Sequence, residues 1–317
     1  MAQNIYGVDI GTSNLKMCCN EKGRILNEKN IIAIANKKEM LAFGDEAYDM
    51  YEKAPENIEV SFPVKFGVIA DIENMQTLLV SFFNKINDDK KFSGNTDFYI
   101  AVPTDVTEVE KRAFYELVAD SKVKAKNIYI VDKPVADAIG AGLDVTKSKG
   151  IMVVNIGAET TEISVISLGG IVISKSIKIG GNKLDDSIIS IIRKEYNLVI
   201  GSKTAEGLKK ELGSAVKAEE KFAPGFGRNV LSGLPVSVQI SSDVIYSAIV
   251  DPLHSIMDSI KVILERTPPE LAADIIKDGI YVTGGTSNIS NLQQFINKET
   301  NLNVNIVENP AESVVRG

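Results

Sequence analysis

The spacing of hydrophobic residues changes in blocks along the chain, and the alternation of strand and helix patterns predicts an α/β fold. Apolar residues run into Asp9 and follow Lys16, which predicts two strands near the N-terminus, at 5–9 and 16–19. A helical spacing begins near residue 70 and predicts an amphipathic helix with one buried face. Its apolar positions are Ile72, Met75, Leu78, Leu79, Phe82, Phe83 and Ile86. Thr107 and Glu110 form a capping box that opens a second helix, which ends at about Asp120.

The second half of the chain repeats the logic of the first. Strands are expected at 151–155, 162–167 and 171–177. The segment IGGNKLDDSIISIIRKEY then turns into a helix, and N–H groups at such a helix start suit phosphate. The N-terminal region of this helix carries Gly180, Gly181, Asn182 and Asp185. A helix from about Ser202, a strand-rich stretch with the turn SGLP and the strand GIYVTGG follow.

Each half begins with a strand, a glycine turn and a second strand. The two copies read GVDIGTSN from Gly7 to Asn14 and VNIGAETTE from Val154 to Glu162. Gly11 in the first copy and Gly157 in the second free the backbone to turn, so that successive N–H groups can face an anion. One such turn is a weak signal, because most glycine turns between strands are only turns. Two hairpins facing each other would grip a polyphosphate from both sides.

Composition narrows the class of protein. The 317 residues are 44% hydrophobic, which suits a soluble globular protein with a substantial core and room for two domains. A net charge of −7 argues against a nucleic-acid-binding surface, which needs clustered positive charge. The N-terminus MAQNIYG lacks the pattern of a signal peptide, and no apolar run is long enough to span a bilayer. Two adjacent cysteines and a single histidine, His254, make zinc chemistry improbable and favour a reducing, cytoplasmic setting.

Several segments in order carry a family resemblance. They are GVDIGTSN, VNIGAETTE, IGGNKLDD, TAEGLKKELG and YVTGGTSN, together with FPVKFGVIADIENM, VPTDVTEVEKRAF and RTPPELAADIIKDGIYVTGG. The chain resembles the superfamily of actin, the heat-shock chaperone ATPases and the sugar kinases, and within it the MreB family of bacterial actin homologues. The resemblance implies duplicated ribonuclease-H-like domains that close over ATP. Their expected bounds are 1–148 with a small subdomain at about 31–63, and 149–317 with a second one at about 182–245.

The resemblance also suggests a role for each matching position. Asp9 would hold Mg²⁺ through water, with Asn155 in its outer shell. Gly11, Thr12, Ser13 and Asn14 would cradle the β-phosphate, with Gly157, Ala158, Glu159, Thr160 and Gly181 on the other side, Thr160 belonging to the catalytic set. Glu206 and Lys209 would contact the ribose and Lys210 the adenine, and Gly284, Gly285, Thr286, Ser287 and Asn288 would close over the nucleotide. Taken alone, EGLKKE would be an ordinary solvated helix face.

Departures from the family pattern bear on hydrolysis. Where the family typically has Glu-Glu-Pro, this chain has Asp132, Lys133 and Pro134, so Lys133 replaces the acid that positions the attacking water. A charged lysine has no acceptor and cannot be that base. Glu159 adds a carboxylate close to the expected phosphates, and we hypothesise a Lys133–Glu159 ion pair. We therefore expect slow hydrolysis, with Asp132 as a candidate substitute acid.

The resemblance implies a filament of identical subunits whose assembly is coupled to ATP and ADP. The divergent hairpin is similar to that of MreB paralogues in wall-less helical bacteria, and a composition rich in Asn, Lys and Ile suggests an AT-rich genome. Contact with the inner face of the cell membrane would be weak, because the Phe92 loop offers one apolar side chain beside Lys90 and Lys91.

Other classes of protein remain open. The strongest is a non-hydrolysing, ATP-bound scaffold subunit that acts with an active paralogue. A small-molecule kinase would need a carboxylate base and larger substrate-binding insertions. A chaperone would need a further peptide-binding domain. We expect neither.

Overall fold

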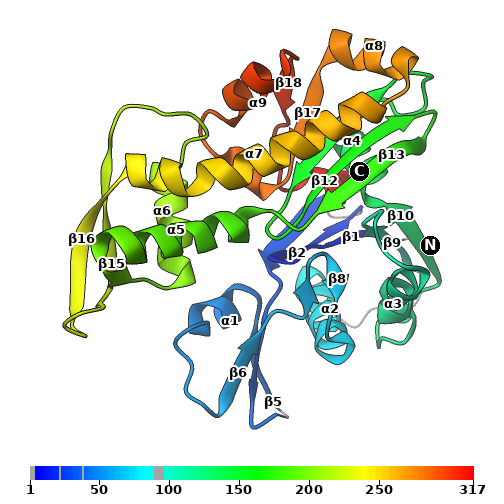
Figure 1. Ribbon diagram of the computed structural model, residues 1–317. Helices are drawn as coiled ribbons and strands as arrows, with labels where there is room; N and C mark the ends of the chain where they lie inside the picture. Colours follow the sequence, from blue (N-terminus) through cyan, green and yellow to red (C-terminus); the bar gives the residue numbers. More distant parts are fainter. Residues whose placement is uncertain (1–3, 21–22, 38, 89–95) are drawn as a thin grey trace. The chain divides into compact units, whose positions relative to one another are not determined.

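The computed structural model describes residues 4–20, 23–37, 39–88 and 96–317. The chain forms two compact units (Figure 1). The first comprises Met1–Lys147, Leu168–Ile171 and Ala311–Gly317, and the second comprises Ser148–Ser167 and Val172–Pro310. The first unit therefore includes two short segments from late in the chain.

Each unit is built on a five-stranded mixed sheet. The first sheet has the order β10 (Asn127–Asp132), β9 (Thr96–Val102), β1 (Asn4–Ile10), β2 (Asn14–Cys19) and β3 (Arg24–Lys29). The second has the order β18 (Val304–Ile306), β17 (Ile280–Thr283), β11 (Ile151–Ile156), β12 (Thr161–Ser167) and β13 (Gly170–Ile177). In each, the first strand of the half pairs antiparallel with the next strand and parallel with a later one. The two sheets match strand for strand, so the chain is a duplication of one sheet.

Helices cover both faces of the first sheet. The helices are α2 (Ile72–Ile86), α3 (Glu108–Ala119), α4 (Lys133–Gly140) and α10 (Ser313–Arg316). Tyr6 and Phe98 pack with the buried face of α2, whereas Ala101 packs with α4 and α10. The predicted α2 is confirmed, and so is the capping box of α3, in which Thr107 and Glu110 exchange hydrogen bonds. The chain forms a smaller three-stranded sheet directly after β3. Its members are β4 (Ile32–Ala35), β5 (Glu39–Phe43) and β6 (Ile58–Ser61), with α1 (Gly44–Met50), while β7 (Val64–Lys65) and β8 (Val68–Ile69) form a short ribbon.

The second unit carries more helix than the pattern predicted. Its helices are α5 (Gly181–Tyr196), α6 (Ser202–Leu212), α7 (Ser242–Arg266), α8 (Pro269–Asp278), α9 (Leu292–Thr300) and the 3₁₀ turn η1 (Gly285–Asn288). The predicted strand-rich stretch is confirmed as β15 (Phe222–Asn229) and β16 (Pro235–Ser241), which join β14 (Leu198–Val199). Thr286, Ser287 and Asn288 belong to η1, and α9 begins at Leu292. No helix in the described ranges is long and apolar enough to cross a bilayer.

Candidate functional site

The two glycine hairpins share one backbone geometry. Gly11 donates its N–H to the Asn14 carbonyl at 3.0 Å, and Gly157 donates to the Thr160 carbonyl at 2.8 Å. Each glycine directly follows a buried isoleucine at the end of a strand. A Cβ on Gly11 would lie 2.7 Å from the Asn14 oxygen, so this tight closure requires glycine. The sequence repeat is therefore a repeat of structure, as predicted.

Neighbouring side chains brace the first hairpin. Asn30 is fully buried, and its Nδ2 donates to the Gly11 carbonyl at 2.8 Å while its backbone N–H donates to the Ser13 carbonyl. Lys29 donates from Nζ to Ser13 Oγ at 3.2 Å. Two further bonds join Asn14 Nδ2 to Asn27 Oδ1 at 2.9 Å and the Gly67 N–H to Thr12 Oγ1 at 3.2 Å. The loop expected to cradle phosphate is thus held in one shape before any ligand binds.

Asp9 lies two residues before Gly11 and is 1% exposed. Its Oδ2 lies 2.7 Å from Lys16 Nζ, and its Oδ1 lies 3.2 Å from Lys133 Nζ. Burial alone would raise the pKa of the Asp9 carboxyl, but the charges of Lys133 and Lys16 outweigh burial and hold the pKa well below its usual range. Sequence reasoning missed Lys16, although it lies opposite Asp9 in the strand register.

Lys133 is the first residue of α4, and Asp132 is the exposed N-cap residue before it. Asp132 ends β10 and Lys133 begins α4, so the two residues lie on different elements. The predicted partner of Lys133, Glu159, belongs to the second unit, whereas Asp9 belongs to the first. The Lys133–Glu159 pair stays a prediction, and the structure places an ion pair between Lys133 and Asp9.

In the second unit, backbone N–H groups at the start of α5 donate hydrogen bonds to the second hairpin. Gly181 donates its N–H to the Gly157 carbonyl at 3.0 Å, and Asn182 donates to the Ala158 carbonyl at 2.7 Å. Two of the N–H groups expected to face phosphate are thus bonded within the chain, because the loop of the second hairpin packs its carbonyl oxygens onto the helix start. Phosphate binding at this helix start stays a prediction. Gly181 is instead a point of close packing, where a Cβ would lie 2.7 Å from Thr286 Oγ1.

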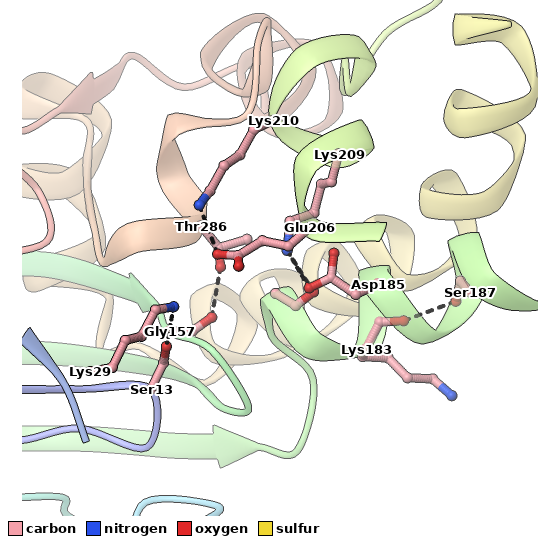
Figure 2. A network of polar contacts seen from close by, with 11 residues as sticks. Ser13, Lys29, Gly157, Lys183, Asp185, Ser187, Glu206, Lys209, Lys210 and Thr286 are labelled. Carbon is pink, nitrogen blue, oxygen red and sulfur yellow. Dashed lines mark hydrogen bonds and ion pairs between the residues drawn. The ribbon is translucent and has the colours of Figure 1, made fainter. Parts of the chain in front are cut away.

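The predicted nucleoside contacts gather around the same helix start (Figure 2). Lys209 Nζ donates to the Gly181 carbonyl at 2.9 Å and lies 2.8 Å from Asp185 Oδ2. Both side chains of this ion pair are 11% exposed. Glu206 pairs one turn further along with the exposed Lys210 at 2.8 Å. The structure thus brings these residues together, and it adds Asp185 as the residue that orients Lys209.

The Asp185–Lys209 pair should make stability depend on pH. Burial raises the pKa of the Asp185 carboxyl to about 6, which the charge of Lys209 only partly offsets. The folded protein then holds a proton that the unfolded chain, with a value near 3.8, has lost. The stability of the wild type relative to Asp185→Asn should therefore fall by up to about 3 kcal/mol as pH rises from about 4 to about 7.

Denaturant unfolding of both proteins across this pH range measures the effect. Taking the difference cancels every other titrating group that the variant leaves unchanged. A difference that does not vary with pH would show that Asp185 titrates normally.

The segment after β17 closes this part of the site. Thr286 donates from Oγ1 to the Gly157 carbonyl at 2.7 Å, so η1 is tied to the second hairpin. Ser287 donates from Oγ to the Gly284 carbonyl, whereas Gly285 and Asn288 are exposed. The glycine pair was expected to admit a ligand, but the two positions differ, because only Gly284 is packed against the chain's own backbone.

Comparisons with known proteins show the family of the chain. A model of the MreB/Mbl protein family matches residues 3–317. The chain is 39% identical over 313 residues to the cell shape-determining protein Mbl of Bacillus subtilis, covering 98% of this chain and 93% of Mbl. It is 36% identical over 323 residues to the cell shape-determining protein MreB of Escherichia coli, covering 100% of this chain and 92% of MreB.

Solved structures of bacterial actin-like proteins have a similar fold. MreB5 of Spiroplasma citri bound to ADP has a TM-score of 0.94 at 35% identity, covering 99% of this chain and 94% of that one. The same protein bound to AMPPNP also gives 0.94. A double helical filament of MamK, at 21% identity and a TM-score of 0.83, shows a likeness of fold alone, over 100% of this chain and 97% of MamK.

Proposed function

The chain belongs to the MreB/Mbl family, and we propose that it is an actin-like cytoskeletal protein that binds ATP or ADP and assembles into filaments inside the cell. One observation carries the nucleotide part of this proposal. The chain has two glycine hairpins of one geometry, and MreB5, which has almost the same fold, is bound to ADP and to AMPPNP. The filament part is supported by the family and by the MamK filament, whose subunit shares the fold.

We further propose that hydrolysis is slow. Lys133 stands where the family resemblance places the water-positioning acid, and its ammonium group lies against Asp9. An ammonium group donates hydrogen bonds but accepts none, so it cannot take a proton from the attacking water. ATP binding would then drive assembly, with hydrolysis too slow to limit the lifetime of the filament.

Sedimentation and phosphate release in the same tubes test this function. We expect the purified protein to pellet with ATP and to release phosphate much more slowly than it assembles. Failure to bind nucleotide would overturn the nucleotide part, and binding without any pelleting would overturn the filament part. Phosphate release as fast as assembly would overturn slow hydrolysis alone.

A non-hydrolysing scaffold subunit is the second candidate, because Lys133 replaces the acid that hydrolysis needs. Such a subunit would hold ATP permanently and copolymerise with an active paralogue. Sedimentation of mixtures distinguishes the two, since a scaffold subunit pellets only with its partner. The membrane contact suggested by Lys90, Lys91 and Phe92 lies outside the described residues and is retained as a proposal, with flotation on anionic lipid vesicles as its test.

A further inference from the structure

The carboxylate expected to hold magnesium is engaged by two lysines. Asp9 is the last residue but one of β1, and its side chain is 2% exposed. Lys16 reaches it from the adjacent strand β2 at 2.7 Å, and Lys133 reaches its other oxygen from α4 at 3.2 Å. The two lysine side chains are 13% and 18% exposed, so all three charged groups lie largely out of water.

These residues do not fit a magnesium ion. Mg²⁺ keeps several of its waters, and a carboxylate holds it by accepting hydrogen bonds from them or by direct coordination. Each oxygen of Asp9 instead faces an ammonium group, and a dication brought close to two ammonium groups would be repelled. Within the described residues, no three His, Cys, Asp or Glu side chains lie together in a group that could hold a metal. The equivalent position in the second hairpin is Asn155, which carries no charge.

We propose that Lys16 and Lys133, fixed in place by Asp9, form a cation site for the nucleotide phosphates and take the place of the magnesium ion expected there. The inference rests on the proposed nucleotide binding and names the charge that would neutralise the phosphates. Asp9 lies two residues before and Lys16 two residues after the segment 11–14, which the bond from the Gly11 N–H to the Asn14 carbonyl closes. Lys133 joins them through its ion pair with Asp9. An ammonium group has three donors, so a bond to one carboxylate oxygen does not exhaust it.

Asp9 has a different role in this arrangement from the one the family resemblance implies. It is a positioning residue that holds two flexible lysine side chains at fixed points. Fixing them in advance lowers the entropy cost of phosphate binding, since Lys is otherwise among the most mobile side chains. The second hairpin has no such lysine. Its residue equivalent to Asp9 is Asn155, which lies opposite Glu162, whereas Asp9 lies opposite Lys16. The lysine therefore belongs to the first hairpin alone.

The test is the affinity for ATP measured with excess Mg²⁺ and again with EDTA, by titration with a fluorescent ATP analogue. The wild-type affinity should change by less than about threefold between the two conditions. The variant Lys16→Met/Lys133→Met should lose about tenfold or more in EDTA, as expected for removing charge-assisted hydrogen bonds. Lys261→Met is the matched control, because it removes a lysine from a 2.8 Å ion pair with Glu299 in the second unit.

The outcomes separate the two proposals. Loss of wild-type ATP binding in EDTA, with binding restored by Mg²⁺, would overturn the lysine site and leave the nucleotide function intact. No ATP binding under either condition would overturn the nucleotide function and this inference with it. The wild-type comparison decides the question even if the double variant fails to fold, which a thermal melt would reveal.

Discussion

Replacing Lys133 with glutamate is expected to raise the rate of ATP hydrolysis by about a hundredfold, the low end of what general acid–base assistance contributes. The substitution restores an acceptor where the family resemblance places the water-positioning acid. It also removes an ammonium group that would be attracted to the γ-phosphate. Phosphate release under single-turnover conditions measures the change directly, because it is independent of filament turnover.

We expect a gain in hydrolysis rate at the low end of this range because Asp9 lies beside position 133. A glutamate at position 133 would stand beside this buried carboxylate, and two neighbouring carboxylates raise each other's pKa. Lys16 remains to pair with Asp9 at 2.7 Å, which limits the repulsion. The variant should therefore fold, with a modest loss of stability, and gain less than a family member that has the glutamate in its own context.

Lys133→Met is the control that separates two causes. It removes the ammonium group without supplying an acceptor, so it should not raise the rate of hydrolysis. An equal gain in both variants would mean that the lysine inhibits by its charge and that the missing acid is not the limit. If the wild type already hydrolyses ATP as fast as Lys133→Glu, slow hydrolysis is wrong, and Asp132 and Glu159 become the residues to test.

The parts of the fold that were predictable are those in which the local pattern and the final packing agree. The helix 72–86 was visible because six of its apolar residues meet a single core. The two hairpins were visible because closing a strand pair over so short a loop requires glycine at a fixed place. Their common register then follows from the repeat, with Asp9 opposite Lys16 and Asn155 opposite Glu162.

The long helix α7 shows why part of the fold was missed. Its buried residues recur at helical spacing, but Pro252 lies inside it, and an internal proline normally ends or kinks a helix. Here Pro252 is buried in the middle of a 25-residue helix. Packing of the residues on either side, such as Ile249 and Leu253, outweighs the lost hydrogen bond, and that balance depends on tertiary structure.

The site residues that were missed are of two kinds. Lys16 could have been found, because pairing the two predicted strands around Gly11 places it opposite Asp9. The roles of Asn30 and Asp185 could not be predicted, because they come from contacts with Gly11 and Lys209, which are 19 and 24 residues away in sequence. Spacing rules describe neighbours on one element, and these bonds join different elements.

Gly284→Ala is expected to destabilise the protein by about 3 kcal/mol or more, the largest stability effect of any substitution proposed for this site. Gly284 has φ 84° and ψ 156°, a region of backbone conformation open essentially only to glycine. A Cβ there would also lie 2.6 Å from the carbonyl carbon of Ile156 and overlap its oxygen. Both obstacles are backbone, so neither can move aside as a flexible side chain would. Thermal or denaturant unfolding measures the loss.

Gly285→Ala tests whether the nucleotide packs against this glycine. A Cβ on Gly285 would meet nothing within 4 Å, so the variant should keep the wild-type stability to within about 1 kcal/mol. If the nucleotide closes against this exposed glycine, Gly285→Ala should weaken ATP binding while leaving the fold intact. Unchanged ATP affinity would show that the glycine pair serves only the packing of β17 against β11, and it would remove Gly285 from the site. Equal destabilisation by both substitutions would contradict the assigned difference between the two glycines.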